Sequence, residues 1–386
     1  MNVYDVIIIG AGAAGLSAAM IATNNKKRVL ILDMGNAPAR KVAVSGGGRC
    51  NITNAAVAYT RYFGTNPNFV RGAIARVSPN DILDWMNKHD IEYTEKTPGQ
   101  YFCKTTAIDV VNALLSDSHG AEIKYNHTVS GVQKENDLFI IYANDKKFSA
   151  KNLIVATGGT SFATLDVSDI GHKIAKHFGH KIVPVRPALC AIATNLFSSD
   201  LAGISTHVQI IIGKEKFNDD LLFTHFGIGG PATYRATVRD ITNGFTINMR
   251  PDVNMYDIMR SAKQKNGKRT ITNIVSEFLP LRLARFLTNN DTRNIADIKD
   301  TEIKIVADKI NAYKIDYKNI KLHNLQSAEV VRGGISTDDV SSKTMESKLC
   351  PGLFFAGEVL DIAGDLGGFN LHWAWASGRV AGQSIH

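Results

Sequence analysis

Short apolar runs and a stretch of small residues alternate along the start of the chain. Val6–Ile9 is an uninterrupted apolar run, which predicts a strand buried on both faces. A stretch rich in Gly and Ala, ending near Ala22, predicts a helix, and Arg28–Asp33 predicts a second buried strand. This strand–helix–strand order is typical of α/β domains with a parallel sheet.

The pattern changes several times further along the chain. A Gly-rich loop is expected up to Asn54, and Ser78-Pro79 then begins a helix with Ser as N-cap and Pro in the first turn. From Ala121 to Val155 the apolar positions alternate with period two, which predicts short strands. Helices are expected at Thr106–Ser118 and Val167–Phe178, and strands at Glu122–Tyr125, Val129–Lys134, Leu138–Tyr142 and Leu153–Val155.

The middle of the chain differs from both ends. Residues 189–252 are mostly strand-like, residues 253–323 are helical and rich in Lys, and the tail returns to a strand near Leu353–Ala356 and a helix from about Asn370. We therefore expect an α/β fold with one discontinuous Rossmann-like domain, residues 1–188 and 324–386. A β-barrel-like domain and a helical domain would be inserted within it.

Composition narrows the class of protein. The 386 residues are 44% hydrophobic and 21% charged, as in a soluble globular protein. No apolar run reaches the ~18 residues of a membrane span, and Val6–Ile9 is too short for a signal-peptide core. We expect a cytoplasmic protein that starts at Met1 and has no membrane partner. The 4 cysteines contain no close pair, which argues against a disulfide scaffold.

Positive charge is concentrated in one segment. The net charge is +8, and residues 255–321 hold 14 basic against 8 acidic residues. A solvated helical face explains this excess most simply, and a surface that binds a polyanion is the alternative. Aromatic residues in the segment are scattered and form no RNA-binding signature. A nucleic-acid partner is therefore the secondary hypothesis.

A glycine motif follows the first strand directly. Gly10, Gly12 and Gly15 form GxGxxG, in which the three glycines permit a tight turn, a close pyrophosphate and close helix packing. The helix that follows offers free N–H groups to phosphate. Asp33 ends the second strand and can accept hydrogen bonds from ribose hydroxyls. This combination predicts a site for NAD or FAD.

Three later features favour FAD. A strand leads into Ala156-Thr157-Gly158, a second loop that would touch the cofactor. Gly357-Glu358 follows another apolar strand, and Gly368–Leu371 begins a helix whose dipole could stabilise negative charge on a reduced flavin. The glycines of Ser45–Asn51 would let backbone N–H groups face the flavin or an anion.

The sequence resembles a bacterial flavoprotein family with a glutathione-reductase-type FAD domain, whose members include aminoacetone oxidases and bile-acid flavoprotein reductases. Arg40–Asn54 matches RKxxxSGGGRCNxTN, and Leu222–Pro231 matches LFTHxGxSGP with Gly229 in place of Ser. The resemblance covers nearly the whole chain. One loop departs from it, because Ala163 replaces a Pro and Asp166 and Asp169 replace glycines.

The pattern and the resemblance together give a set of expected site residues. The cofactor-binding residues are Gly10, Gly12, Ala13, Ala14, Gly15, Asp33, Met34, Arg40, Lys41, Ser45, Gly46, Gly47, Gly48, Asn51, Val129, Ala156, Thr157, Gly158, Gly357, Glu358, Gly368, Phe369, Asn370 and Leu371. The candidates for proton transfer are His225 and His372. No metal-ligand spacing is present, and Cys50 has no nearby partner cysteine.

These residues predict an FAD-dependent oxidoreductase that transfers a hydride between flavin N5 and a small organic substrate. An oxidase that uses O₂ on an amine and a reductase fed by NAD(P)H both fit the sequence. The chain has no second GxGxxG for a dedicated NAD(P)H domain. The alternative function is a flavin-containing protein that binds nucleic acid through the basic helical insert.

Overall fold

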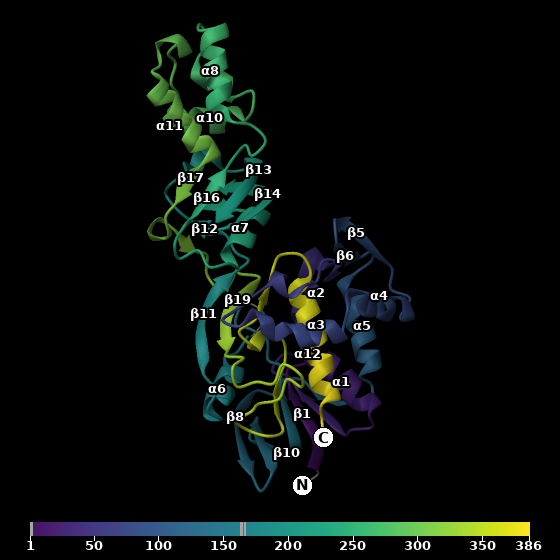
Figure 1. Cartoon of the computed structure of the whole chain (residues 1–386). Coiled ribbons are helices and arrows are strands. Elements are labelled where there is room, and N and C mark those ends of the chain that lie inside the picture. Colours follow the sequence, from purple (N-terminus) through teal and green to yellow (C-terminus); the bar gives the residue numbers. More distant parts are fainter. Residues whose placement is uncertain (1–2, 163–164, 166) are drawn as a thin grey trace. The chain divides into compact units, whose positions relative to one another are not determined.

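The computed structural model describes residues 3–162, 165 and 167–386. The chain divides into two compact units (Figure 1). Unit 1 comprises Met1–Pro187 and Leu325–His386, and unit 2 comprises Ala188–Asn324. Both ends of the chain therefore belong to the same unit. Ala163 and Asp166, two of the three unusual positions noted in the sequence, lie outside the described residues.

A mixed seven-stranded sheet forms the centre of unit 1. Its order is β7-β2-β1-β10-β9-β8, and β20 pairs with β10 beside β9. Strands β7, β2, β1, β10 and β20 are parallel, whereas β9 and β8 are antiparallel additions. The bounds are β1 Val3–Ile9, β2 Val29–Leu32, β7 Glu122–Lys124, β8 Val129–Glu135, β9 Leu138–Ala143, β10 Lys146–Val155 and β20 Leu353–Phe355.

The strands of this sheet follow from the apolar runs in the sequence. Val6, Ile7 and Ile8 in β1 are fully buried, as expected for a strand covered on both faces. The α/β class predicted from the sequence is confirmed. The helices of unit 1 are α1 Ala13–Asn24, α2 Arg40–Gly48, α3 Arg71–Arg76, α4 Pro79–Lys88, α5 Ala107–Asp117, α6 Ile170–His177 and α12 Phe369–Gln383.

Helices from opposite ends of the sequence pack tightly against each other. Figure 1 shows α12, in yellow, beside α1 at the purple end of the colour bar. A Cβ added at Gly378 or Gly382 would lie 2.3 Å from the carbonyl oxygen of Ala14 or Ala18. Only glycine allows this approach, so the last helix fixes the position of the first.

Local signals define the remaining helix starts in unit 1. Ser78 and Asp81 form a reciprocal capping box at the start of α4, where Pro79 occupies the first turn. This confirms the helix predicted at Ser78-Pro79. Three small sheets complete the unit: β3 Asn51–Asn54 with β6 Gln100–Cys103 and β5 Tyr93–Thr97, β4 Tyr62–Phe63 with β21 Ala363–Gly364, and β11 Ile182–Ala188 with β19 Val330–Ile335.

Unit 2 contains a seven-stranded antiparallel sheet and a group of helices. The sheet order is β17-β16-β13-β14-β15-β12-β18. Its strands are β12 Ile192–Ala193, β13 Ser205–Ile212, β14 Glu215–Thr224, β15 Gly227–Gly229, β16 Phe245–Asn248, β17 Tyr313–Ile315 and β18 Lys321–Leu322. Its helices are α7 Gly230–Thr237, α8 Met255–Lys265, α9 Ile271–Val275, α10 Leu281–Leu287 and α11 Asp300–Asn311.

One hydrophobic core runs through the whole of unit 2. Phe223 and Ile247 from the sheet belong to the same buried cluster as Leu283 and Ile303 from the helices. The sequence pattern divides residues 189–252 from 253–323, because strand periodicity changes to helix periodicity there. The shared core instead joins both segments in one compact unit, with β17 returning to the sheet after the helices.

Candidate functional site

The carboxyl ends of four parallel strands meet at one edge of the unit 1 sheet. The backbone N–H of Ala156, just after β10, donates to the carbonyl of Ile9 in β1 at 2.9 Å, and that of Ala356, after β20, donates to Val155 at 3.1 Å. Asp33 directly follows β2. Parallel α/β sheets bind ligands at this edge. The sheet thus brings Gly10–Gly15, Asp33, Ala156–Gly158 and Gly357-Glu358 to a common edge.

The three glycines of the first motif have different environments. A Cβ on Gly10, whose φ is +107°, would lie 2.4 Å from the carbonyl oxygen of Ala156. A Cβ on Gly15 would lie 1.9 Å from the carbonyl oxygen of Gly10. Gly12, the N-cap of α1, would meet no protein atom within 4 Å. Two glycines therefore allow close packing, and the third faces open space at the helix N-terminus.

The Asp33 carboxylate organises the turn beside α1. Its Oδ2 accepts a hydrogen bond from the Ala11 N–H at 2.6 Å, and its Oδ1 accepts one from the Gly35 N–H at 2.7 Å. Arg40 lies 4.0 Å from Oδ1. An ionised carboxylate has about four acceptor sites, so capacity remains for ribose hydroxyls. Met34 is half-buried next to it.

The expected loop before Asn54 contains a helix with a sharp kink. α2 starts at Arg40, and its helical conformation is interrupted at Ser45, Gly46 and Gly47. Gly46, Gly47 and Gly48 have φ values of +58°, +67° and +80°, which favour glycine. A Cβ on Gly47 or Gly48 would meet no protein atom within 4 Å. The Ser45 hydroxyl donates to the Val42 carbonyl at 2.8 Å and holds the kink.

Lys41 and Glu358 form the centre of a polar cluster. Lys41 Nζ lies 3.1 Å from Glu358 Oε2 and 3.0 Å from the Ser161 hydroxyl. The other carboxylate oxygen of Glu358 accepts from the Val331 N–H at 3.0 Å. The sequence predicts Arg40 and Lys41 as cofactor-binding residues, and in the structure each lies beside a carboxylate.

Ser161 and Val331 are absent from the sequence prediction. They lie far from Glu358 in the chain, in segments that carry no motif of their own. Only the folded chain brings Ser161 and Val331 to Glu358.

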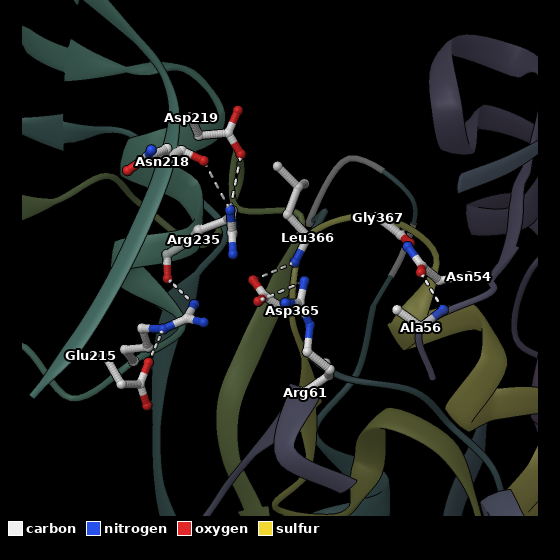
Figure 2. A network of polar contacts seen from close by, with 12 residues as sticks. Asn54, Ala56, Arg61, Glu215, Asn218, Asp219, Arg235, Asp365, Leu366 and Gly367 are labelled. Carbon is white, nitrogen blue, oxygen red and sulfur yellow. Dashed lines mark hydrogen bonds and ion pairs between the residues drawn. The ribbon is translucent and has the colours of Figure 1, made fainter. Parts of the chain in front are cut away.

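The turn before α12 is held by side chains from an earlier segment. Figure 2 shows Asn54 donating through Nδ2 to the Gly367 carbonyl, at 2.7 Å, and accepting from the Ala56 N–H, at 2.9 Å. Arg61 forms an ion pair with Asp365 at 3.2 Å in the same turn. These contacts fix the N-terminus of α12, which begins after Gly368 with φ +92°.

The predicted residues around this turn point in different directions. Phe369 is fully buried and packs edge-on against Tyr62. The Asn370 side chain bonds both the N–H and the carbonyl of Gly364. Leu371 packs against the core. These side chains support the turn, and the backbone N–H groups at the start of α12 are what the helix can offer to a ligand.

The remaining predicted positions lie on unit 1 as well. Val129 is buried at the start of β8, and Asn51 donates through Nδ2 to Gln100 at 3.0 Å. Gly158 follows β10 with φ +72°, and a Cβ there would meet no protein atom within 4 Å. Asp169 occupies the N-cap position of α6, and its side chain pairs with Lys173 at 2.9 Å.

The geometry of this edge fits FAD. Gly12, Gly47, Gly48 and Gly158 come from three separate segments, and each has open space where a side chain would stand. A free helix N-terminus suits the pyrophosphate, and Asp33 suits a ribose. The open glycines allow backbone N–H groups to contact a flat cofactor without interference from side chains.

His372 is locked inside unit 1. It is fully buried, its Nδ1 lies 2.8 Å from the Thr53 hydroxyl, and its Nε2 lies 2.9 Å from the Val77 carbonyl. Nε2–H must therefore donate to Val77, and Nδ1 accepts from Thr53. Burial, with a smaller contribution from Arg379, lowers its pKa to about 4. The hydrogen bonds favour a positioning role for His372 in place of the predicted proton transfer.

The other histidine candidate belongs to unit 2. His225 lies in the two-residue turn between β14 and β15 and is exposed. Its neighbour Phe226 stacks on His323, with ring centroids 5.1 Å apart. A role of His225 in proton transfer stays a prediction.

The part of the chain that the structure describes contains neither a candidate metal centre nor a helix that could span a membrane. Across residues 3–162, 165 and 167–386, no group of three or more His, Cys, Asp or Glu side chains is arranged to hold a metal ion. Within the same residues, no helix has both the length and the apolarity to cross a membrane. Burial raises the pKa of the Cys50 thiol above its ordinary range, which disfavours the reactive thiolate.

Comparison with known proteins identifies relatives along the full chain. The family described as "HI0933-like protein Rossmann domain" matches residues 4–384. A "Ribosomal RNA dihydrouridine synthase" of Escherichia coli is 34% identical, covering 100% of this chain and 98% of its own. One of Haemophilus influenzae is 38% identical, covering 98% of each chain. A "3-dehydro-bile acid delta(4,6)-reductase" of Clostridium scindens is 26% identical, again covering 98% of each chain.

Proposed function

The chain belongs to the HI0933-like protein family of FAD-dependent oxidoreductases, and from this premise we propose that it reduces a uridine of ribosomal RNA to dihydrouridine. One observation carries the proposal. Two relatives with the name ribosomal RNA dihydrouridine synthase align with this chain from end to end, at 34% and 38% identity. The open glycines of unit 1 support it by fitting the cofactor that such a reduction needs.

The chemistry sets what the protein must provide. Reduction of the uracil C5=C6 bond adds a hydride equivalent at C6, the carbon conjugated to the C4 carbonyl, and a proton at C5. FAD, when bound, supplies the two electrons. The described residues that would hold it are the N–H groups at the α1 N-terminus, Asp33 and the glycines at the end of α2. His225 remains our candidate for the proton.

The direction of the reaction selects the redox partner. Adding two hydrogens to a base consumes electrons, so the enzyme needs a donor such as NAD(P)H, and an O₂-using amine oxidase does not fit. The Clostridium scindens relative also carries the name of a reductase. We therefore propose ribosomal RNA in place of the small organic substrate expected from the sequence. Such a substrate agrees with the predicted cytoplasmic location.

The oxidation state of the flavin can test this proposal. The holoenzyme would be reduced anaerobically with one equivalent of NADPH or NADH and then mixed with transcribed ribosomal RNA that carries no modifications. We expect the absorbance of oxidised flavin to return with this RNA, and not with polyadenylate or with aminoacetone. Reoxidation by the amine and not by the RNA would contradict the proposal.

A further inference from the structure

Unit 2 contains a cavity of about 470 Å³ between its helices and the edge of its sheet. Arg282, Arg285 and Phe286 of α10 line it, together with Lys309 of α11 and Tyr313 of β17. None of the cofactor-binding residues predicted from the sequence belongs to this lining. The family motifs and the proposed function therefore leave this feature unexplained.

The cations of this cavity are among those of the basic segment that form no ion pair within the described residues. Arg282 donates to the backbone carbonyl of Asp200 at 2.6 Å. Among the described residues, none of Arg282, Arg285 and Lys309 forms an ion pair with a carboxylate, although Asp200 also lines the cavity. Elsewhere in the segment carboxylates pair with five cations, which are Arg260, Lys263, Arg269, Arg293 and Lys304. Positive charge is thus left uncompensated where the surface is hollow.

Aromatic rings accompany these charges. Tyr313 and Phe286 are half-buried, with ring centroids 5.1 and 6.1 Å from that of Phe197. The Tyr313 hydroxyl donates to the Leu196 carbonyl at 3.2 Å, which fixes the ring. Rings held in this way offer a surface for stacking a nucleobase at low entropic cost. A cavity for an inorganic anion alone would not need them.

Two asparagines add groups that can read a base edge. Asn289 and Asn290 follow α10, line the cavity and are exposed. Their φ values of +54° and +52° belong to the tight turn that ends the helix. Their side-chain amides present both donors and acceptors. Phosphate-binding cations, aromatic rings and amides together are typical of a site for single-stranded nucleic acid.

We propose that this cavity binds a single-stranded segment of ribosomal RNA. Arg282, Arg285 and Lys309 take backbone phosphates, and a base stacks beside Phe286 and Tyr313. The inference rests on the proposed function, and it adds a contact in unit 2 to the chemistry assigned to unit 1. It also gives the basic segment a specific binding element in place of a diffuse positive face.

Binding to a labelled oligouridine can test the cavity. The probe is a short single-stranded RNA with a terminal fluorescein, and its anisotropy is measured with the holoenzyme over a range of salt concentrations. We expect Arg282→Ala/Arg285→Ala/Lys309→Ala to raise Kd by about tenfold or more. A plot of log K for binding against log salt concentration should become less steep by about two. Each phosphate contact with a single strand contributes ~0.7 to the steepness of that slope.

A matched control removes the same charge elsewhere. Lys265→Ala/Lys268→Ala/Lys318→Ala also deletes three positive charges from exposed positions in the same basic segment, outside the cavity lining. Its Kd should stay within about threefold of the wild type. Equal weakening by both variants, or unchanged binding by the cavity variant, would overturn the inference. FAD content and thermal unfolding of both variants verify that they fold.

The outcomes separate this inference from the proposed function. A loss of oligouridine binding confined to the cavity variant supports the RNA site, whatever the wild type does with ribosomal RNA. A wild type that binds the oligouridine but forms no dihydrouridine contradicts the proposed function alone. If the wild type forms dihydrouridine and the cavity variant binds RNA equally well, the result contradicts the RNA site proposed in the cavity and not the proposed function.

Discussion

Gly12 lies at the start of α1, where an added Cβ would meet no protein atom within 4 Å. Its φ of −85° is also acceptable to other residues. Gly12→Ala should therefore leave the fold intact and weaken FAD binding about ten- to a hundredfold, through overpacking of about 1–3 kcal/mol against the cofactor. Titration of the flavin-free protein with FAD measures the effect.

Gly131 provides the matched control for Gly12. It lies in β8, and a Cβ there also meets open space. Gly131→Ala should bind FAD within about threefold of the wild type. Equal affinities of the two variants would place the dinucleotide away from the α1 N-terminus.

Asp33 tests the other end of the predicted dinucleotide site. Its carboxylate holds the N–H groups of Ala11 and Gly35 and can accept further bonds from a ribose. Asp33→Ala should weaken FAD binding by about 1.5–3 kcal/mol, the range for hydrogen bonds to charged groups. Isothermal titration with FAD measures this loss, and an unchanged affinity in a folded variant would remove Asp33 from the site.

His372 gives a prediction about pH and stability. Burial lowers its pKa from 6.5 to about 4. The unfolded chain therefore binds a proton that the folded protein excludes, and the folded protein loses stability as pH falls from about 6.5 to about 4. The loss should reach about 3 kcal/mol at ~1.4 kcal/mol per pH unit. Above pH 6.5 this contribution should be constant.

Urea unfolding of His372→Gln at several pH values isolates this effect. Glutamine can still donate to Val77 and accept from Thr53, but it does not titrate. The variant should lose less stability than the wild type between pH 6.5 and 4, whereas the exposed His119→Gln should follow the wild type. Parallel curves for His372→Gln and the wild type would show that the buried ring is not the cause.

At the scale of elements, the contact between α1 and α12 joins the two ends of the chain. A Cβ on Gly382 would lie 2.3 Å from the Ala18 carbonyl oxygen. Alanine usually stabilises a helix interior relative to glycine by up to about 1 kcal/mol. In Gly382→Ala, overpacking against Ala18 should outweigh this gain in helix stability and destabilise unit 1 by about 1–3 kcal/mol.

The temperature at which FAD is released, detected as a rise in flavin fluorescence during heating, measures this destabilisation of unit 1. Gly382→Ala should release FAD at a lower temperature than the wild type. Gln383→Ala, at an exposed position of the same helix, should have little effect. A higher release temperature for Gly382→Ala would contradict the close packing of α12 on α1.

The sequence predicts the elements that have strong local signals. The apolar runs place β1 and β2, and the N-cap Ser78 places the start of α4, to within a few residues. The helix expected at Thr106–Ser118 corresponds to α5. α2 was missed, because Arg40–Val44 is too short to show a period and the glycines that follow are typical of a loop. β3 and β11 were also missed, since pairing with distant strands decides their conformation.

In the candidate site too, residues within a local motif can be predicted from the sequence, whereas contacts between distant segments cannot. The glycines and Asp33 can be predicted, because backbone geometry requires them at fixed spacing. The contacts of Lys41 with Glu358 and Ser161 join segments 317 and 120 residues apart, so no local pattern indicates them. The sequence predicts proton transfer by His372, because it does not reveal that both ring nitrogens are hydrogen-bonded.

At the scale of the whole molecule, the features that fit FAD and the cavity proposed to bind RNA lie in different units. Unit 1 carries the glycines and carboxylates that fit FAD, and unit 2 carries the unpaired cations of the cavity beside α10. The relatives align along the whole chain and not only over the cofactor-binding segments. In the proposed reaction, unit 1 would hold the redox centre and unit 2 would bind the RNA.

Nucleoside analysis of treated RNA tests the central claim most directly. Unmodified ribosomal RNA would be incubated anaerobically with the holoenzyme and NADPH or NADH, digested to nucleosides and analysed by mass spectrometry. We predict a nucleoside two hydrogens heavier than uridine that co-elutes with dihydrouridine and is absent without enzyme or donor. Full flavin turnover with another acceptor, and no dihydrouridine in the RNA, would contradict the account.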